Sequence, residues 1–425
     1  MWKKPTAPVP IHPSQIVLGL YIWIDLPWDD HPFLYNRFKI NEMEQLEVLK
    51  TLALAGKLYY YPEKSEATPA PSQESEPPGA AAPSQAQEAL RDALTRRNKE
   101  KKEQLWQQKD AAARADRAWE AAARATREAM LSMRDAPRQA GIQLQALSQQ
   151  TAKKIAEGQE ILLHLLGDKN GEGPQFHALN VMTLSMLLGK VAGLNEKQLA
   201  DLALGALAHD IGKVRIPPHL LKTKVRAKHE EAFYRDHVKY GLELAMLSQA
   251  FSPPALEILS QHHEYVDGSG WPAGRSGPQL STVSRIVALV NRYDRLCSPE
   301  SPEKEALMPA EALARLFRTE TARFDGKLLS LMIKLLGVYP PGTVVRLNDD
   351  ALGLVVSPGR DSLRPTVLIY TPEVNKKEAP TVDLAKAPQL KIEEALRPST
   401  LPPDVQAWMN PRQRLSYFYS SENVE

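Results

Sequence analysis

The sequence predicts a mainly α-helical protein with a small α+β module at its N-terminus and a small β subdomain towards its C-terminus. From position 137 to about 336, apolar residues recur at helical spacing in a series of amphipathic segments. Short runs rich in β-branched and aromatic residues lie on either side, at 16–61 and 343–370. A chain of 425 residues with 43% hydrophobic content is long enough for about two to three such domains.

Residues 1–61 are predicted to form the α+β module. A strand-like run at Gly19–Asp25 precedes a helical stretch at Asn41–Leu54, and an aromatic strand follows at Leu58–Tyr61. Residues 62–90 then consist largely of Pro, Ala, Ser, Gln and Glu, with almost no large apolar side chains. Such a segment cannot bury enough surface to offset the entropy lost on ordering, so we expect a flexible linker there.

A long charged helix is predicted at 91–136. This stretch is rich in Ala, Arg, Glu, Lys and Gln, which all favour helix. Apolar residues recur at a seven-residue spacing, at Leu105, Ala112, Trp119 and Met133, although polar residues occupy other seam positions. The helix could pair with a second copy as a coiled coil and form a homodimer, or remain a solvated single helix, and the sequence leaves both open.

The helical domain proper is predicted at 137–339. Its helical pattern continues through Leu166, breaks at 167–174 and resumes as several amphipathic helices. Three short β-type runs separated by Asn, Asp, Gly and Pro turns predict the small β subdomain at 340–375. Residues 376–425 are expected to be a polar tail.

Composition excludes several classes of protein. The single cysteine, Cys297, rules out an intramolecular disulfide and leaves histidines as the candidate metal ligands. No apolar run approaches about 18 residues and the first ten residues lack an apolar core, so neither a membrane span nor a signal peptide is predicted. A formal charge of +2 gives no support for a nucleic-acid partner. A cytoplasmic location is expected.

Five histidines and one aspartate in the helical domain suit a metal centre, namely His177, His209, Asp210, His237, His262 and His263. Imidazole and carboxylate ligands favour iron, manganese or zinc over calcium. His209 and Asp210 follow the apolar helix predicted at 198–208, and His262 and His263 follow the one at 254–261. Adjacent polar pairs at the ends of apolar helices are costly to bury without an ion, so we expect these helix ends to converge on metal.

Two divalent ions at such a centre could activate water and clamp phosphoryl oxygens, which makes a phosphodiester the natural substrate class. Asp210 could bridge the two ions, and Lys213 could place its ammonium on a phosphate oxygen. The alternative for Lys213 is a solvated loop lysine. The remaining histidines, His12, His31, His164, His219 and His229, lie in no such motif and are interpreted as surface or core groups.

Two motifs together resemble the HD-GYP domain: His209-Asp-Ile-Gly-Lys213 and His262-His-Glu-Tyr-Val-Asp-Gly-Ser-Gly-Trp-Pro272. The resemblance extends from about His177 to Tyr339. It implies an HD-type bundle of helices that hydrolyses cyclic di-GMP to the linear dinucleotide or to GMP. The N-terminal module also resembles a small domain of unknown function found ahead of such domains, through Leu18-Gly-Leu-Tyr-Ile and Pro32-Phe33. A role in regulation or assembly is implied for it.

The resemblance also implies roles for single residues. The first metal would be held by His177, His209 and Asp210 with position 291, and the second by Asp210 with His237, His262 and His263. Lys213 would contact phosphate, and Gly270, Trp271 and Pro272 would form a loop facing substrate or a partner. Two ions, iron or manganese, are implied as cofactors.

This sequence departs from the family pattern at four places. Asn291 replaces an aspartate that binds the first metal, so metal affinity should fall. Gly173 replaces the glutamate that holds a third metal in some members, which leaves two ions as the upper expectation. Ser298–Glu303 carries two acidic residues in place of an Arg-Pro-Tyr stretch and should repel a dianionic dinucleotide. Trp271 replaces a tyrosine, keeping an aromatic plane but losing the hydroxyl.

Three functions are therefore open. The first is a cyclic di-GMP phosphodiesterase of bacterial second-messenger signalling in which Asp210 and Lys213 serve catalysis. The second is a weakened member that acts as a cyclic di-GMP receptor or as a scaffold for a partner such as a diguanylate cyclase, and Asn291 and the acidic loop favour it. The third is an HD hydrolase for another phosphoester.

Overall fold

The computed structural model describes most of the chain: residues 7–26, 31–33, 36–51, 56–71, 85–157, 161–165, 174–223, 225–299, 306–359, 361–372, 376, 379–409 and 415–419. The chain divides into two compact units. The first comprises residues 1–110, 344–355 and 366–410, and the second comprises residues 111–343, 356–365 and 411–425. The second unit is the helical domain that the sequence predicts, and it carries the candidate metal ligands.

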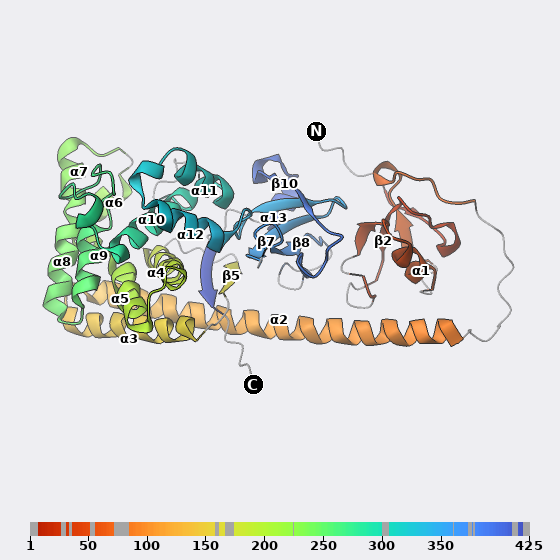
Figure 1. The fold of residues 1–425 in the computed structure, drawn as a ribbon, viewed down its shortest axis with the longest axis horizontal. Helices are drawn as coiled ribbons and strands as arrows, with labels where there is room; N and C mark the ends of the chain where they lie inside the picture. Colours follow the sequence, from red (N-terminus) through yellow and green to blue (C-terminus); the bar gives the residue numbers. More distant parts are fainter. Residues whose placement is uncertain are drawn as a thin grey trace. The chain divides into compact units, whose positions relative to one another are not determined.

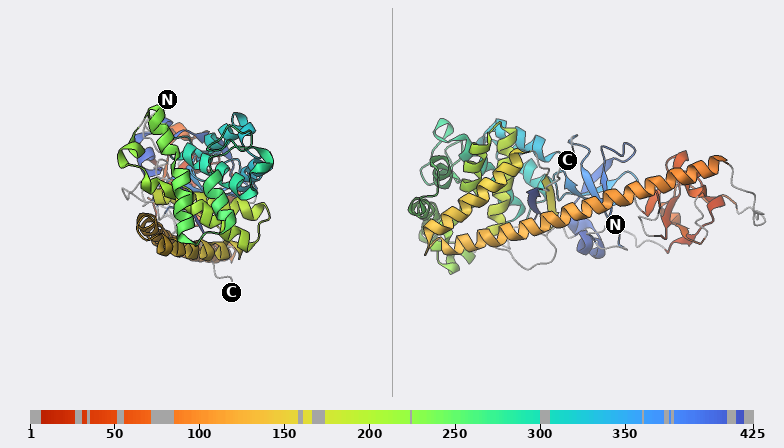
Figure 2. Two further views of the ribbon diagram at one scale, coloured as in Figure 1. Left: turned by 90° about the vertical axis from the view of Figure 1, so that its left-hand side faces the viewer. Right: turned by 90° about the horizontal axis from the view of Figure 1, so that it is seen from below.

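The helical unit begins with the C-terminal part of α2 (Gln85–Ser132), which is one continuous helix (Figure 1). Pro137 then occupies the first turn of α3 (Pro137–Ala156), where its missing N–H costs nothing. Helix α3 returns alongside the C-terminal part of α2 (Figures 1 and 2). The remaining helices are α4 (Pro174–Val191), α5 (Glu196–Ala208), α6 (Pro218–Lys222), α7 (Lys228–Arg235), α8 (His237–Ser248), α9 (Pro253–Gln261), α10 (Thr282–Cys297), α11 (Pro309–Arg318) and α12 (Gly326–Leu336).

Helix α5 lies at the centre of this unit and packs against α3, α4 and α9. From Leu202 to Ala208 it is apolar on all sides, and Leu202, Ala206 and Leu207 are fully buried. Its Gly205 permits the close approach of α9, because a Cβ there would lie 2.5 Å from Cδ1 of Ile258. The close crossing brings the C-terminal ends of α5 and α9 together, and these are the ends that carry the two adjacent pairs of candidate ligands.

The apolar face of the long helix is buried within its own chain. Trp119, Ala123, Met130 and Met133 all belong to the core of the helical unit, and the Trp119 ring stacks on Phe176 with 6.2 Å between ring centroids. Over these residues, α2 is therefore neither a coiled-coil seam nor a solvated helix. The side chains of the two earlier seam residues, at 105 and 112, lie outside the described part.

The predicted continuation of helix through Leu166 was wrong. Helix α3 ends at Ala156, and residues Ile161–Leu165 form strand β5, which pairs antiparallel with β11 (Leu415–Tyr419). A short apolar run fits a buried strand as well as a helix, and only the partner strand decides between them. That partner comes from the part of the sequence where a polar tail was expected.

The N-terminal part of the first unit is an α+β module, as predicted. Strands β1 (Val9–Pro10), β2 (Tyr21–Ile24), β3 (Arg37–Lys39) and β4 (Leu58–Tyr60) form an antiparallel sheet in the order β1-β4-β2-β3. Helix α1 (Met43–Thr51) contributes Leu49 to a core that also holds Leu20 and Ile22, all fully buried. The module thus buries one face of a small sheet.

The first part of the expected linker at 62–90 belongs to this module. Residues Pro62–Lys64 form a short 3₁₀ turn, and the Tyr21 amide donates to Oγ of Ser65 at 2.9 Å. The Ala70 amide donates to the Gln15 carbonyl oxygen at 2.9 Å. These hydrogen bonds order residues 65–70, although this segment has few large apolar side chains. Helix α2 then begins at Gln85, and residues 72–84 lie outside the described part.

A five-stranded sheet occupies most of the C-terminal part. Its order is β10-β6-β7-β8-β9, formed by β6 (Val344–Leu347), β7 (Leu352–Ser357), β8 (Thr366–Ile369), β9 (Thr381–Asp383) and β10 (Ile392–Leu396). The small β subdomain is confirmed, but the expected polar tail at 376–425 was wrong, because β9, β10, α13 (Pro403–Met409) and β11 lie within it. Glu393 and Glu394 of the edge strand β10 are exposed. Charged residues are common on edge strands, and they weaken the apolar pattern from which a strand is predicted.

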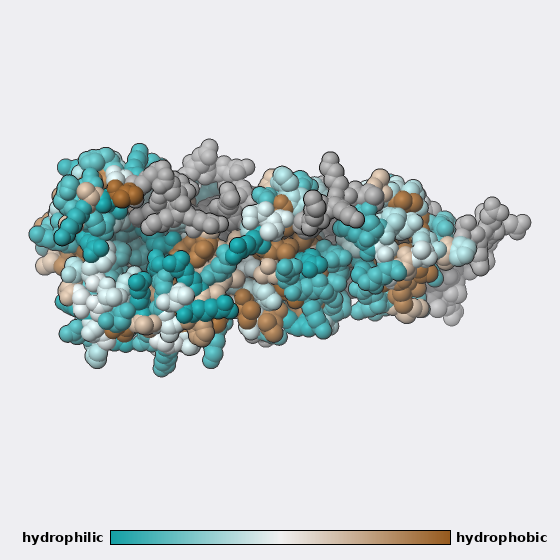
Figure 3. Space-filling view, turned by 90° about the horizontal axis from the view of Figure 1, so that it is seen from above, coloured by the Kyte–Doolittle hydropathy of each residue, from teal (hydrophilic) through white to brown (hydrophobic). Residues whose placement is uncertain are grey.

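On the face drawn in Figure 3, hydrophobic residues form small separate groups among hydrophilic ones. Within the described ranges, no helix is both long enough and apolar enough to cross a lipid bilayer.

The buried tryptophan of α2 gives a test of this packing. We expect Trp119→Ala to lower the free energy of unfolding of the helical unit by about 3–5 kcal/mol, because it removes a fully buried aromatic ring and leaves a cavity. Urea unfolding of the full chain followed by circular dichroism measures the change. Trp106→Ala on the same helix is the control, since that ring is 64% exposed and its loss should cost less than about 0.5 kcal/mol. Equal losses in both variants would contradict the packing described.

Candidate metal centre

The candidate ligands come from the ends of several helices. His209 is the C-terminal cap of α5, and Asp210 starts the 3₁₀ turn η3 (Ile211–Arg215). His237 is the first residue of α8, and His262 with His263 follows the last residue of α9. His177 alone lies inside a helix, one turn into α4. The structure brings all six sequence-predicted ligands together.

These residues form two groups that share one carboxylate. The first is His177, His209 and Asp210, and the second is Asp210, His237, His262 and His263. Within each group, one ligand atom per residue lies within 4.8 Å of the others. This is the division into two half-sites that the resemblance implies, and we call them the first and second half-sites.

The ring orientation of the histidines is fixed by hydrogen bonds at Nδ1. Nδ1 of His209, His237 and His262 donates to the carbonyl oxygens of Ala206, Tyr234 and Leu259 at 2.7, 2.7 and 3.0 Å. Nδ1 of His177 donates to Oδ2 of Asp294 at 2.6 Å. Since Nδ1 holds the proton in each neutral ring, Nε2 presents its lone pair to the centre, as metal ligation requires.

The second half-site contains buried polar atoms with no partner in the described structure. They are Oδ1 of Asp210 and Nε2 of His237, His262 and His263. Oδ1 lies 3.4 Å from Nε2 of His237 and 3.8 Å from Nε2 of His262. An unsatisfied buried polar atom costs about 1–3 kcal/mol, and four acceptors facing one another call for a cation. The residues present therefore fit a divalent metal ion.

Electrostatics keeps these rings in the form that binds metal. Burial lowers the pKa of His177 and of His237 to about 4, and it lowers the pKa of His262 and His263 well below the usual range. These four imidazoles are thus neutral at pH 7, and a neutral imidazole is a ligand. For Asp210, burial raises the pKa, but the neighbouring Lys213 and His209 outweigh it and hold the pKa well below its usual range.

The first half-site has a different environment. Oδ2 of Asp210 accepts from Nζ of Lys213 at 2.8 Å and from Nη2 of Arg295 at 2.7 Å. The same oxygen lies 3.4 Å from Nε2 of His209 and 3.7 Å from Nε2 of His177. The two Nε2 atoms are 3.1 Å apart. Two positive side chains thus already bind the oxygen that faces this half-site.

Helix α10 contributes three residues from one face. Asn291, Asp294 and Arg295 are spaced so that they project together, and Asp294 and Arg295 contact His177 and Asp210. Asn291 is 5% exposed, and its Oδ1 has no hydrogen-bond partner in the described part of the chain. Sequence reasoning missed Arg295, and its spacing of four from Asn291 on an amphipathic helix was the signal that could have found it.

The loop at Gly270–Pro272 covers the second half-site. The Trp271 ring stacks on His263 with 4.0 Å between centroids, and its backbone N–H donates to the His263 carbonyl oxygen. Gly270 leaves no room for a side chain, because a Cβ would lie 2.5 Å from Cα of Glu264. The Glu264 carboxylate accepts from the Ala273 amide at 2.7 Å and fixes the loop. One face of the Trp271 ring is thus occupied by a candidate ligand.

The histidines set aside in the sequence do not join the cluster. His219 and His229 are exposed, and His31 is buried beside Asn36, with 3.4 Å between Nε2 and Oδ1. His12 caps a 3₁₀ turn in the N-terminal module. The side chain of His164, Gly173 and residues 300–305 of the acidic loop lie outside the described part, so the expectations placed on them stay predictions.

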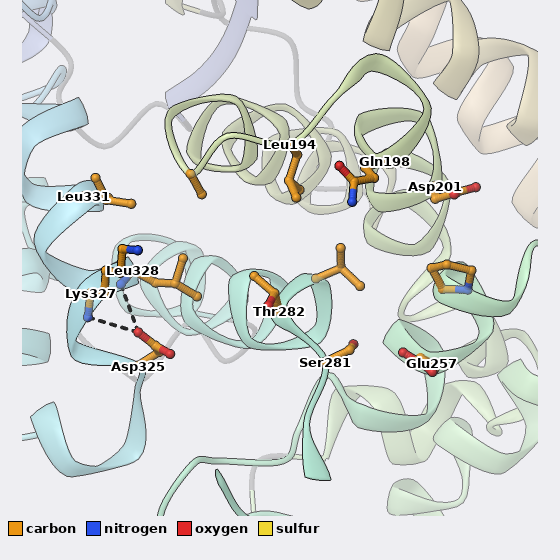
Figure 4. Close-up of a pocket in the computed structure, with 13 residues that line it drawn as sticks. Leu194, Gln198, Asp201, Glu257, Ser281, Thr282, Asp325, Lys327, Leu328 and Leu331 are labelled. Atoms are coloured by element: carbon orange, nitrogen blue, oxygen red, sulfur yellow. Dashed lines mark hydrogen bonds between the residues drawn. The ribbon is translucent and has the colours of Figure 1, made fainter. Parts of the chain in front are cut away.

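A pocket of about 520 Å³ opens elsewhere in the helical unit, between the ends of α5, α9, α10 and α12 (Figure 4). Its lining includes none of the candidate ligands. Asp201, Glu257 and Asp325 line it with a single lysine, Lys327. Such a lining does not suit an anionic dinucleotide.

Comparison with known proteins defines the class to which this site belongs. The family model described as "HD domain" matches residues 140–328, and the one described as "Domain of unknown function (DUF3391)" matches residues 9–141. Residues 140–328 therefore match the HD-domain family and residues 9–141 the DUF3391 family, in agreement with the two resemblances stated from the motifs.

Curated relatives are found for the HD part. The chain is 31% identical over 217 residues to cyclic di-GMP phosphodiesterase PA4108 of Pseudomonas aeruginosa, across 50% of this chain and 52% of the relative. It is 33% identical over 150 residues to the cyclic di-GMP phosphodiesterase response regulator RpfG of Xanthomonas campestris, across 35% and 39%. It is 29% identical over 160 residues to 3'3'-cGAMP-specific phosphodiesterase 2 of Vibrio cholerae, across 37% and 30%. The chain spans about half or less of the length of these relatives.

The contact between η3 and α8 gives a test of how the site is positioned. A Cβ on Gly212 would overlap the His237 carbonyl oxygen and the Gly241 amide nitrogen, so Gly212→Ala must push Asp210 away from His237. We expect at least about a tenfold loss of Mn(II) affinity and a loss of about 1–3 kcal/mol in stability. Isothermal titration of the full chain measures the affinity.

Gly326→Ala is the control for this prediction. Gly326 begins α12, and a Cβ there would meet no atom within 4 Å. This variant should bind Mn(II) as the parent does. Parental affinity in Gly212→Ala would show that the close contact does not hold the ligands in place.

Proposed function

We propose that this chain is a metal-dependent phosphodiesterase that hydrolyses cyclic di-GMP to linear pGpG or GMP in bacterial second-messenger signalling. The observation that carries the proposal is the second half-site, where Oδ1 of Asp210 faces three unpaired imidazole nitrogens within an HD domain. Curated relatives of this domain are named cyclic di-GMP phosphodiesterases, and this supports the choice of substrate.

The residues of the centre supply binding and charge. A divalent ion held by His237, His262 and His263 with Oδ1 of Asp210 would polarise a phosphoryl oxygen and lower the pKa of water. The hydrogen bonds at Nδ1 hold the His237 and His262 rings in one orientation, and the His263 ring stacks on Trp271, so the three imidazoles need little reorganisation on binding. Lys213 is 14% exposed beside Asp210 and offers its ammonium to a non-bridging phosphate oxygen, where negative charge develops.

The substrate proposal extends to the class of cyclic dinucleotides. Another relative of the HD part is named for 3'3'-cGAMP, so this compound is the natural competitor for cyclic di-GMP. Iron or manganese as the ion follows from the imidazole and carboxylate donors. The family resemblance adds a second ion at the first half-site. A diguanylate cyclase partner and a cytoplasmic location stay predictions. A homodimer formed through the apolar face of α2 would use the N-terminal part of that helix, since this face is buried in the core around Trp119.

A second candidate function is a receptor that binds the dinucleotide without turnover. Asn291 favours this candidate, because its amide brings no negative charge to the first half-site, and its Oδ1 has no partner within the described residues. In that case the protein would bind cyclic di-GMP or a partner through the same surface, and the helical connector would transmit the binding event.

Product analysis tests the function directly. Protein purified anaerobically and loaded with Fe(II) or Mn(II) is expected to convert cyclic di-GMP to pGpG or GMP, with 3'3'-cGAMP assayed beside it. His237→Ala should lower the rate at least about 100-fold, because it removes a ligand with an unpaired Nε2. The double variant His209→Ala, Asp210→Ala should be inactive, and the exposed His229→Ala is the matched control. Tight dinucleotide binding without product would favour the receptor instead.

The Asn291→Asp substitution distinguishes between a natural chain that is an active enzyme and one that is catalytically weakened. The substitution adds one negative charge to the first half-site with little change in shape. If the parent is an enzyme, we expect kcat to change by less than about tenfold, which is below about 1.4 kcal/mol in the activation free energy. The measurement is kcat for cyclic di-GMP in both proteins under the same metal loading. Strong hydrolysis that arises only in the variant would show that the natural chain is a weakened member.

A further inference from the structure

The two oxygens of the Asp210 carboxylate have opposite environments. Oδ1 faces the second half-site and has no hydrogen-bond partner in the described structure. Oδ2 faces the first half-site and already accepts from Arg295 at 2.7 Å and from Lys213 at 2.8 Å. A carboxylate that bridged two ions would offer one oxygen to each. In Asp210 only Oδ1 is available to bind an ion.

The first half-site nevertheless requires positive charge. Nε2 of His177 and Nε2 of His209 lie 3.1 Å apart, and Nδ1 of each ring already bonds an oxygen atom. If neither Nε2 atom carries a proton, their lone pairs face each other beside Oδ2, and this arrangement is unfavourable unless positive charge from a proton or another cation is near. Either a second metal ion or the Arg295 guanidinium could supply that charge.

The charges around the centre favour the guanidinium. The contacts of the centre join two acidic side chains, Asp210 and Asp294, to two basic ones, Lys213 and Arg295, so they balance before any ion binds. Asn291 adds no charge. One divalent ion can use the open Oδ1 and three neutral imidazoles. A second ion would bring two more positive charges next to Arg295 and Lys213, and the contacts among the described residues of the centre add no further carboxylate to offset them, so it would be repelled.

We propose that Arg295 takes the place of the first metal ion, so that the centre binds one divalent ion at the second half-site and uses a built-in guanidinium at the first. The proposal rests on the proposed metal-dependent function. Arg295 binds Asp210 through Nη2, and its side chain is 20% exposed and so lies at the edge of the centre rather than fully inside it. A fixed planar cation with several donors is suited to bind the non-bridging oxygens of a phosphodiester as an ion would.

The experiment counts ions rather than relying on activity. The full chain is loaded anaerobically with Mn(II) and desalted, manganese per chain is measured by mass spectrometry, and the spin state is recorded by electron paramagnetic resonance. The parent is expected to hold one ion with the spectrum of isolated Mn(II). In the double variant Asn291→Asp, Arg295→Ala, the first substitution adds a carboxylate and the second removes the guanidinium and leaves room for an ion. This variant should hold two ions with an exchange-coupled spectrum.

Two further variants act as controls. Arg318→Ala removes an exposed arginine at the end of α11 and should match the parent in ion number and spectrum. Arg295→Lys keeps the charge and should also hold one ion. In Arg295→Ala with a single bound ion, we expect kcat for cyclic di-GMP to fall roughly 100-fold, because a preorganised donor to the phosphoryl group is lost. Circular dichroism of each variant verifies that the fold is retained.

The outcomes separate this inference from the proposed function. One isolated ion in the parent and two coupled ions in the double variant support the inference whether or not cyclic di-GMP is hydrolysed, and a lack of product then counts against the proposed substrate only. Two coupled ions in the parent overturn the inference and leave the proposed function standing. A double variant that still holds one ion overturns the role given to Arg295. A parent that binds no ion overturns both proposals.

Discussion

The helical unit is organised around one carboxylate, that of Asp210. Every candidate ligand lies near one of its two oxygens, and so do both positive side chains of the centre. A single negative charge buried among four neutral imidazoles would be unstable without Lys213 and Arg295, because desolvation opposes its ionisation. The packing of the surrounding helices can thus be understood as the means of holding these cations and imidazoles against that carboxylate.

Close backbone contacts give the centre its position. Gly205 lets α5 and α9 cross without a gap, and Gly212 lets the turn after Asp210 lie directly on α8. Gly270 does the same for the loop that stacks Trp271 on His263. At Gly205 and Gly212 an absent side chain sets the distance between two elements that bear candidate ligands, and at Gly270 it sets the distance between such an element and the Trp271 loop. Small residues therefore define the arrangement of the candidate ligands although they offer no donor atom.

Much of this could be predicted from the sequence, and the limits have physical reasons. Paired polar residues at the ends of apolar helices, such as His209 with Asp210, are a local signal, and the structure does bring them together. The spacing of Arg295 from Asn291 indicates a shared face of α10, but the contact of Arg295 with Asp210 depends on how α10 lies against the end of α5, which spacing alone does not determine. Strand β5 and the strands at 381–396 were missed because strand pairing is a non-local property. The partner of the apolar face of α2 around Trp119 could not be predicted, because a helix buried within its own chain and a helix buried in a dimer can show the same seven-residue spacing of apolar residues.

The pairing of β5 with β11 has a consequence for the order in which the protein is made. Strand β5 precedes α4, the helix that carries His177, and β11 also packs against α4. Its partner strand, at 415–419, is synthesised long after all the candidate ligands have left the ribosome. Contacts between segments so distant in sequence form slowly, since the loop between them must close first. The nascent helical unit therefore passes through a stage in which its candidate ligands are present but β5 is unpaired, and the last packing against α4 waits for the synthesis of β11.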